Sequence, residues 1–244
     1  MVGGEPERDA DRTAVKRIIV ADAIFDRFPE FVRGVVVVND VTIRASYKPV
    51  RRLLRAQVAD AVGPGDPRIA TWEAAHRAFG SDPDRFPPSI ASLVRRVSSE
   101  PNLPFVNSVV ALFNTISLKY VLPCGGDDLD EVEGDLVLGP SDGTETFRGL
   151  GSDVVESPEP GEVIYADEGS KSVLCRRWNW RNGDRTKITE ATKRLVINVD
   201  GLPPTSADDV RRARDELAAL LTQHAGASVA TSELSSEKRF LALS

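Results

Sequence analysis

One helix without a charge limits most strongly what this chain can fold into. No residue between Phe105 and Leu118 is charged, and apolar side chains occur nearly all round the predicted helix. Such a helix is buried on most of its sides. Three polar residues, Asn107, Asn114 and Ser117, form one narrow stripe together with Ala111, at steps of four, three and three residues. An unpaired buried carboxamide costs about 1–3 kcal/mol, so this stripe must face partners, water or a ligand.

The overall composition excludes several classes of protein. Lys and Arg number 31 against 37 Asp and Glu, a net charge of −6, which argues against a general DNA-binding or membrane-surface protein. The opening residues have no signal-peptide core, and no stretch is apolar enough to span a membrane. Two cysteines and two histidines are too few for a disulfide scaffold or a zinc site. We therefore expect no metal, no cofactor and a cytoplasmic setting.

The order of periodic segments predicts an α+β fold, with helices packed on short mixed or antiparallel strands. Residues 1–14 are predicted to be a disordered leader, 15–226 a single domain and 227–244 a weakly patterned tail. Helices are expected at 21–31, 48–62, 67–79, 90–97, 105–118 and 205–224. Strands are expected at 17–20, 34–38, 135–138, 145–148, 162–166, 172–180 and 194–199.

No common catalytic signature is present: the chain has no phosphate-binding loop, no nucleophile elbow and no H-E-x-x-H motif. One acidic run suggests calcium, but Val132 stands where an EF-hand loop needs Asp or Asn. A solvated acidic turn is the better interpretation. The run consists of Asp127, Asp128, Asp130, Glu131, Glu133 and Asp135.

A basic segment with tryptophans follows. Residues 176–194 contain seven cations against two acids. A strand over 173–180 would place Trp178 and Trp180 on one face with Arg176, which suits stacking of a base beside a phosphate. We therefore expect RNA contact through four arginines of this segment: Arg176, Arg177, Arg181 and Arg185. The basic side of helix 48–62, with Arg51, Arg52 and Arg55, is a further expected patch. Periodicity alone favours the alternative, a hairpin with core tryptophans and a wet cationic face.

The stretch LPFVNSVVALFNTISLKYVLPCGGDDLDEVEGDLVL, residues 103–138, resembles the editing region of the phenylalanine-tRNA synthetase β chain, its third and fourth B domains. The looser similarity around it covers roughly half the chain, and the whole chain looks like free-standing relatives of that module. The family pattern is kept at Pro104, Asn107, Val109, Val110, Asn114, Pro123, Asp128, Leu129 and Gly134.

The resemblance implies the fold of that editing module and hydrolysis of the ester between a wrong amino acid and its tRNA. A small pocket separates similar side chains by only about 1–3 kcal/mol, which is why editing exists. An activated ester needs positioned water and oxyanion donors rather than a Ser or Cys nucleophile.

Residue by residue, the resemblance places Asn114 at the family's helix asparagine that faces the pocket, so Asn114 is the predicted catalytic residue. The family's pocket histidine aligns with Gly125. Asn198 stands where the family has a glutamate that reads the hydroxyl of tyrosine, so tyrosine specificity is not carried over. The substrate pocket is predicted between the polar stripe and the strands, lined by Asn107, Ser117, Gly125, Trp178 and Asn198.

Two hypotheses from different classes follow. The first is an aminoacyl-tRNA deacylase acting in trans, with the aminoacylated acceptor end of tRNA as partner. The second is a noncatalytic module that binds the tRNA end or the amino acid without turnover; a small-molecule hydrolase or amino-acid sensor is a third. The polar stripe also has a purely structural explanation, in which its asparagines cap neighbouring loops. The sequence leaves the amino acid, the tRNA and the oligomeric state open.

Overall fold

The computed structural model describes residues 17–100 and 102–243, so the predicted leader lies outside the described residues. The helices are α1 (Asp22–Arg27), α2 (Lys48–Ala59), α3 (Pro67–Ala78), α4 (Ser89–Ser99), α5 (Ser108–Tyr120) and α6 (Ala207–Ala225), with a 3-10 turn at Leu129–Glu131. The strands are β1 (Arg17–Val20), β2 (Val32–Asn39), β3 (Cys124–Asp128), β4 (Leu136–Pro140), β5 (Phe147–Arg148), β6 (Val155–Glu156), β7 (Val163–Asp167), β8 (Ser172–Arg176), β9 (Arg181–Asn182), β10 (Leu195–Gly201), β11 (Ser228–Leu234) and β12 (Phe240–Ala242).

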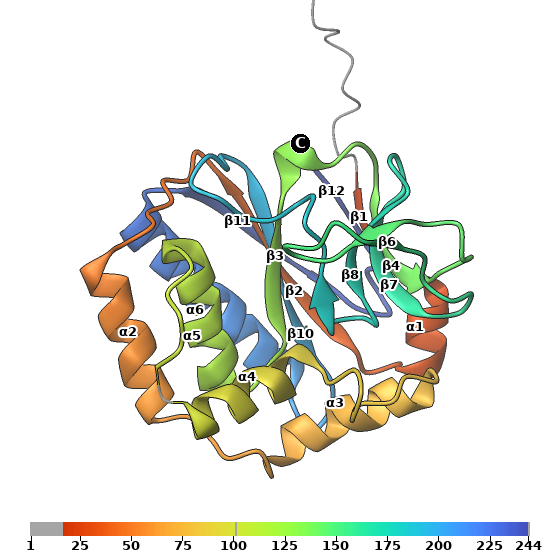
Figure 1. The fold of residues 1–244 in the computed structure, drawn as a ribbon, viewed down its shortest axis with the longest axis horizontal. Coiled ribbons are helices and arrows are strands. Elements are labelled where there is room, and N and C mark those ends of the chain that lie inside the picture. The colour runs from red at the N-terminus through yellow and green to blue at the C-terminus, as the bar shows by residue number, and fades with distance from the viewer. Residues whose placement is uncertain (1–16, 101, 244) are drawn as a thin grey trace, which may run out of the picture.

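Two sheets dominate the described part of the chain (Figure 1). The larger has the strand order β12-β1-β4-β7-β8-β9, and the smaller has the order β11-β2-β10-β3. The smaller sheet is antiparallel throughout, whereas β1 and β4 of the larger sheet are parallel. The predicted α+β class, with helices on mixed and antiparallel strands, is confirmed.

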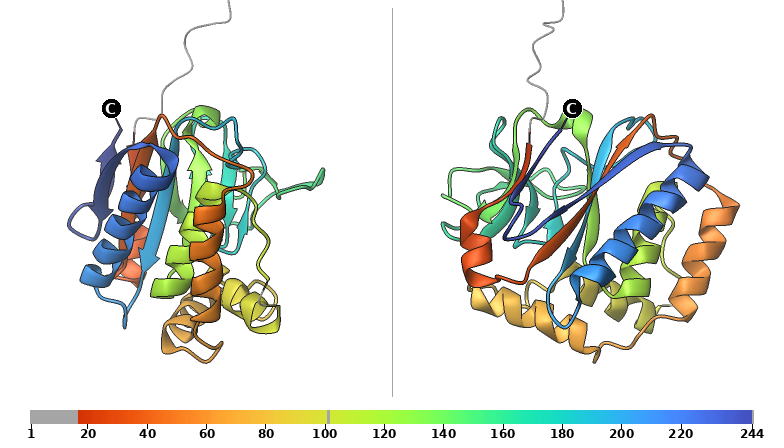
Figure 2. Two further views of the ribbon diagram at one scale, coloured as in Figure 1. Left: turned by 90° about the vertical axis from the view of Figure 1, so that its left-hand side faces the viewer. Right: turned by 180° about the vertical axis from the view of Figure 1, so that it is seen from behind.

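The helices α5 and α6 cover one face of the smaller sheet, and α2 packs on α5, as the back view in Figure 2 shows. α5 packs between α2 and α6, and α6 lies against β2. Gly34 permits this approach, because a Cβ at that position would lie 3.1 Å from the Cβ of Arg214. The opposite face of the smaller sheet meets the larger sheet, where Trp178 Nε1 donates to Asp200 Oδ2 of β10 over 3.1 Å.

α5 confirms the prediction of a helix buried on most sides. It begins at Ser108 rather than at 105 because Asn107 caps it: Asn107 Oδ1 accepts from the backbone N–H groups of Val109 and Val110. In the described residues, no helix has the length and apolar character needed to cross a bilayer.

Local capping signals predicted other helix starts correctly. Asp66 accepts from Arg68 N at the start of α3, with Pro67 in the first helical position. Ser206 and Asp209 form a capping box on α6. The predicted core position of His76 is also confirmed, because its side chain is fully buried.

The strand predicted over 172–180 is wrong beyond Arg176. Arg177 and Trp178 have φ angles of 47° and 64°, in the left-handed region, so the chain turns and the predicted alternation of faces ends. Trp178 turns into the core, where its ring meets Phe31 at 5.1 Å and Trp72 at 5.3 Å between centroids. Packing of this indole outweighs the local strand pattern.

The interpretation of the acidic run as a solvated turn is wrong for its first two residues. Asp127 and Asp128 belong to β3 and are buried, and they accept hydrogen bonds from Thr186 Oγ1 and Thr192 Oγ1. Asp130, Glu131 and Glu133 are exposed, as expected. Glycine and aspartate are rare in strands, so tertiary pairing with β10 decides this element.

Residues 227–244, weakly patterned in the sequence, contribute two strands. β11 pairs with β2 along its whole length, and β12 pairs with β1. β11 is an edge strand, and its side chains are mostly exposed or half-buried on both faces. It therefore has no alternation of apolar and polar residues that a sequence pattern would reveal.

Candidate functional site

Two hollows share the strand β3. An inner cavity of about 70 Å³ lies between the two sheets, and an outer hollow of about 420 Å³ lies between α5 and the chain after β9. Both are lined by Gly126, Asp127 and Asn182. The two hollows therefore adjoin at one stretch of β3. If a ligand placed one part in each hollow, the bond between its two parts would lie at this stretch.

A buried ion pair forms one wall of the inner cavity. Arg33 of β2 donates to Asp200 of β10 through Nε (2.7 Å) and Nη2 (2.8 Å), and the two side chains are 3% and 5% exposed. The guanidinium carbon lies 4.9 Å from the centre of the Tyr165 ring. Because Asp200 also accepts from Trp178, its charge is fully engaged by neighbours.

Four buried polar atoms on residues that line this cavity have no hydrogen-bond partner among the described residues. They are Arg33 Nη1, Tyr165 Oη, Asn179 Nδ2 and Asn198 Oδ1. An unsatisfied buried polar group costs about 1–3 kcal/mol, and four around one cavity indicate a ligand site. Burial raises the pKa of Tyr165 above its ordinary range, so the phenol is neutral.

β3 is an edge strand, and its outer side carries a backbone donor. Asp128 N–H points away from β10, because it donates to Thr186 O at 2.9 Å. N–H groups along a strand alternate in direction, so Gly126 N–H points to the same outer side. This N–H lies where the two hollows adjoin.

Asp127 stands beside that donor and carries the chemistry of an acid or base. Burial raises the pKa of its carboxyl to about 6, although the Thr186 hydrogen bond and the charge of Arg33 act in the opposite direction. Oδ1 accepts from Thr186, whereas Oδ2 makes no hydrogen bond within the described residues. A carboxylate that titrates near neutral pH and has one unengaged oxygen is suited to accept a proton from water.

The predicted substrate-binding residues divide between the hollows. Gly125, Trp178 and Asn198 line the inner cavity, and Asn107 lines the outer one. Gly125 pairs with Asn198 across the sheet, and a Cβ at Gly125 would meet nothing within 4 Å.

The rest of the polar stripe is placed differently. Ser117 Oγ donates to Leu122 O at 2.6 Å, and Asn107 Nδ2 donates to Ile188 O at 3.1 Å, so both bind neighbouring backbone. Asn114 is half-buried on α5 and lines neither hollow. Its catalytic role stays a prediction.

The four arginines predicted to contact RNA lie beside carboxylates. Arg176 binds Glu162 and Glu156, and Arg177 lies 3.5 Å from Glu162 with its guanidinium over Phe86. Both arginine side chains are under 10% exposed. Arg181 is 3.9 Å from Glu156, and Arg185 contacts Glu133. Their charge is therefore largely neutralised within the protein.

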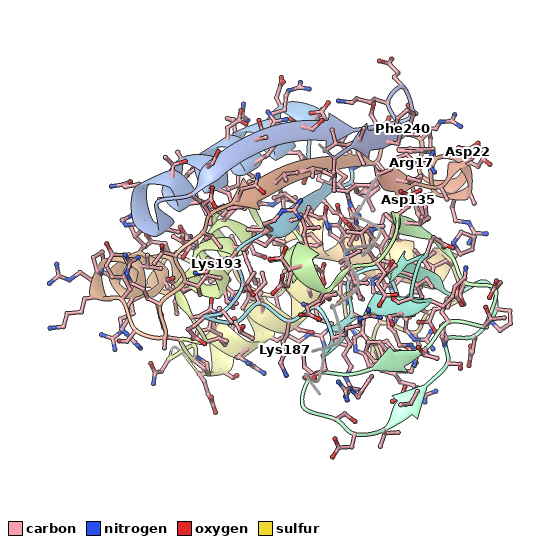
Figure 3. The ribbon with its side chains drawn as sticks, turned by 90° about the horizontal axis from the view of Figure 1, so that it is seen from above. Arg17, Asp22, Asp135, Lys187, Lys193 and Phe240 are labelled. Atoms are coloured by element: carbon pink, nitrogen blue, oxygen red, sulfur yellow. The ribbon has the colours of Figure 1, made fainter. Side chains whose placement is uncertain are left out.

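Cations without such partners are found elsewhere. Arg52 and Arg55 of α2 are exposed and form no ion pair within residues 17–100 and 102–243, while Arg51 stacks on Phe105 at 4.3 Å. Lys193 also forms no ion pair among the described residues, whereas Lys187, which lines the outer hollow, pairs with Asp184 at 3.0 Å. Both lysines lie on the face shown in Figure 3, apart from Arg17 and Asp135.

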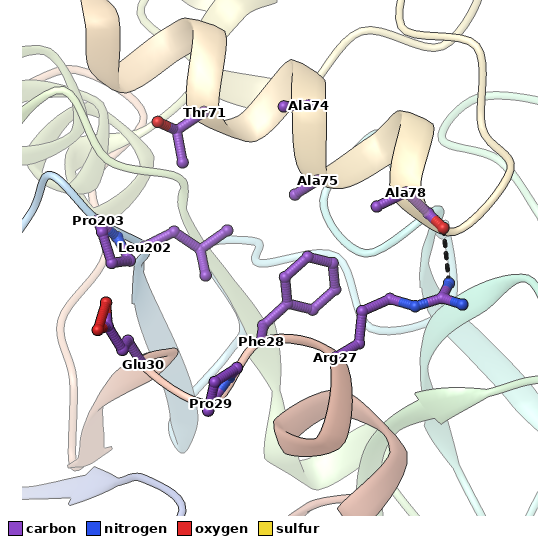
Figure 4. A pocket seen from close by; sticks show the side chains of 10 residues that line it. All are labelled: Arg27, Phe28, Pro29, Glu30, Thr71, Ala74, Ala75, Ala78, Leu202 and Pro203. Atoms are coloured by element: carbon purple, nitrogen blue, oxygen red, sulfur yellow. Dashed lines mark hydrogen bonds between the residues drawn. The ribbon is translucent and has the colours of Figure 1, made fainter.

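A third hollow, of about 380 Å³, is mainly apolar (Figure 4). Phe28, Leu202 and three alanines of α3 line it, and Arg27 at its side donates to Ala78 O. It offers surface for packing but no unpaired buried polar group. Among the described residues, no cluster of three or more His, Cys, Asp or Glu is placed to hold a metal.

Sequence reasoning missed Arg33, Tyr165, Asp127 and Asp200. A signal existed for two of them: Arg33 and Asp200 are charged residues inside the otherwise apolar segments VRGVVVV and LVINVDG. Such a charge in a buried strand requires a partner, and the two residues face each other in the register of β2 and β10.

The model of the B3/4 domain matches residues 71–226 of the 244. The chain belongs to the B3/4 domain family. This match includes β3, β7, β8 and β10, and therefore most of both hollows, whereas Arg33 lies before it.

This B3/4 protein has the fold of a solved relative. An N-terminal fragment of the phenylalanyl-tRNA synthetase beta-subunit from Pyrococcus horikoshii matches with a TM-score of 0.52 and 14% identity. The match covers 94% of this chain and 57% of that chain, so this chain spans a little more than half of the fragment. No curated protein matches the sequence.

Proposed function

We propose that this B3/4 protein is an aminoacyl-tRNA deacylase that hydrolyses the ester of a mischarged tRNA in trans. The observation that carries the proposal is the junction of the two hollows at Gly126 and Asp127, where an outward N–H and a carboxylate lie on successive residues. The synthetase-fragment fold supports this choice of ester.

In the proposed reaction, the amino-acid part enters the inner cavity and the terminal nucleoside occupies the outer hollow. Exposed Val106 and Leu150 there offer apolar contact to a base. Asp127 takes a proton from water as the water oxygen attacks the ester carbonyl. Gly126 N–H donates to the resulting oxyanion. The intermediate then breaks its bond to the ribose oxygen, which receives the proton, leaving a free amino acid and tRNA.

The decisive experiment is a deacylation screen of matched and mismatched aminoacyl-tRNA pairs, each charged by a separate synthetase. A deacylase shortens the lifetime of at least one pair when the protein is present at one-hundredth of the tRNA concentration. A module that only binds protects or sequesters the ester, and only at stoichiometric concentration. If the protein hydrolyses none of the aminoacyl-tRNAs at this catalytic concentration, the proposal is refuted.

Gly125→Leu should abolish at least nine-tenths of the deacylase activity while the protein stays folded. A Cβ at this position meets nothing within 4 Å, and Gly125 lines the inner cavity, so we expect the rest of the leucine side chain to occupy that cavity. Gly65→Leu is the matched control, since Gly65 is exposed and equally uncrowded. Initial rates and urea unfolding measure both variants; full activity in a folded Gly125→Leu protein contradicts this use of the cavity.

The double variant Arg52→Ala and Arg55→Ala should weaken binding to the tRNA acceptor end and reduce its salt slope by about 1.4, or about 0.7 for each lost phosphate contact. These arginines have no carboxylate partner in the described residues, so their charge is available to phosphate. Arg239→Ala is the control, because Arg239 pairs with Asp22 at 2.6 Å. Affinities at several salt concentrations measure the slope, and an unchanged slope would exclude α2 from the interface.

A further inference from the structure

The inner cavity has a chemical pattern that points to one kind of amino-acid side chain. We infer that it selects a small, neutral side chain ending in a carboxamide, with asparagine as the best fit. This inference rests on the proposed function, because it takes the ligand to be the amino-acid part of an aminoacyl ester.

The unpartnered atoms of the cavity include both donors and an acceptor. Arg33 Nη1 and Asn179 Nδ2 donate only, Asn198 Oδ1 accepts, and Tyr165 Oη does both. A carboxamide presents a carbonyl oxygen to the arginine and an NH₂ group to the asparagine oxygen or the phenol. An aliphatic side chain would leave all four atoms unpaired, and a site built for hydrogen bonds rejects such an analogue strongly.

The charges around the cavity disfavour a carboxylate. Arg33 is the cation beside the cavity, and two of its nitrogens already bind Asp200. Asp127 lines the same cavity, and its carboxyl is ionised above a pH of about 6. A ligand carboxylate would therefore lose its hydration without gaining an uncompensated positive charge.

The size of the cavity excludes large side chains. A volume of about 70 Å³ corresponds to about five to seven water molecules at 10–15 Å³ each. Trp178, Tyr165 and the Arg33–Asp200 pair are fixed in the core, so these walls do not retreat easily. An aromatic amino acid is too large, whereas asparagine fits.

The test uses three aminoacyl-adenosine analogues in which a stable amide replaces the ester. Asparagine, aspartate and leucine are close in shape and differ in polarity, so they separate hydrogen bonding from size. Calorimetric titration at pH 7.5 should give at least tenfold tighter binding of the asparagine analogue than of either other analogue. Tighter or equal binding of the leucine or aspartate analogue, or no binding of the asparagine analogue at millimolar concentration, overturns the inference.

Tyr165→Phe links the selectivity to the cavity. The variant removes only the hydroxyl and keeps the ring under Arg33, so folding should survive. Its affinity for the asparagine analogue should fall about tenfold, while its affinity for the leucine analogue should not fall. Unchanged selectivity would mean that residues outside this cavity recognise the amino-acid side chain.

The same amino acids attached to tRNA separate this inference from the proposed function. Selective binding of the asparagine analogue without hydrolysis of any ester supports the inference and refutes the deacylase. Hydrolysis that is faster for leucyl-tRNA than for asparaginyl-tRNA supports the deacylase and refutes the inference.

Discussion

Asp127→Asn should lower the rate of deacylation about 10²–10⁴-fold, the usual contribution of a positioned general base. The substitution keeps the shape of the side chain and an oxygen that accepts from Thr186 Oγ1. It removes only the ability to take a proton from water. Single-turnover hydrolysis of the ester identified in the screen measures the loss.

The pH dependence gives this prediction a second readout. The wild-type rate, corrected for spontaneous hydrolysis, should rise with pH through about 6, where Asp127 ionises, and then level off. The Asp127→Asn rate should show no such rise. A variant that keeps the wild-type rate and profile would remove Asp127 from the mechanism.

Stability should respond in the opposite sense. The folded protein holds the Asp127 proton up to a pH of about 6, above the ordinary value of 3.8. The stabilisation from this proton is therefore fully present below about 4 and is lost as the pH rises through about 6. Asparagine is never ionised, so the unfolding free energy of Asp127→Asn should equal or exceed that of the wild type at pH 8.

Asn114→Ala distinguishes the structural assignment from that implied by the family resemblance. If Asn114 positions water or the oxyanion, its removal should cost about 10²–10³-fold in rate. Because Asn114 lines neither hollow, we expect the Asp127→Asn loss to be the larger of the two. A larger rate loss for Asn114→Ala than for Asp127→Asn would mean that Asn114 of α5 is the main catalytic residue.

Arg176→Ala should lower the free energy of unfolding by about 3–5 kcal/mol, the cost of leaving one partner of a buried ion pair uncompensated. Arg176 binds Glu162 through Nε (2.9 Å) and Nη2 (2.6 Å), and the glutamate side chain is only 1% exposed. The variant leaves that carboxylate in the interior without its main counter-charge.

Arg181→Ala is the matched control for this prediction. Arg181 is 40% exposed and lies 3.9 Å from Glu156, so its removal should cost less than about 1 kcal/mol. Urea unfolding of both variants at pH 7 measures the difference. Equal stability of the two would mean that Arg176 is not a structural cation and would restore it as a candidate for RNA contact.

The sequence by itself determined the elements whose signals are local. The uncharged segment before Leu118 predicted a buried helix, and Asp66 and Ser206 predicted helix starts. The order of the segments, helices first and then mostly strands, predicted the α+β class. Caps and periodic apolar faces act within a few residues of the chain, so they are legible without knowledge of the fold.

Tertiary structure alone decided β3, the turn at Arg177 and the inner cavity. β3 is a strand of glycines and aspartates because it pairs with β10, and Trp178 leaves its strand because its indole fills the core. Arg33 and Asp200 are 167 residues apart, and only the pairing of β2 with β10 brings them together. A site whose atoms come from both sheets has no local pattern, because burial and unmet hydrogen bonds arise only after the sheets pack.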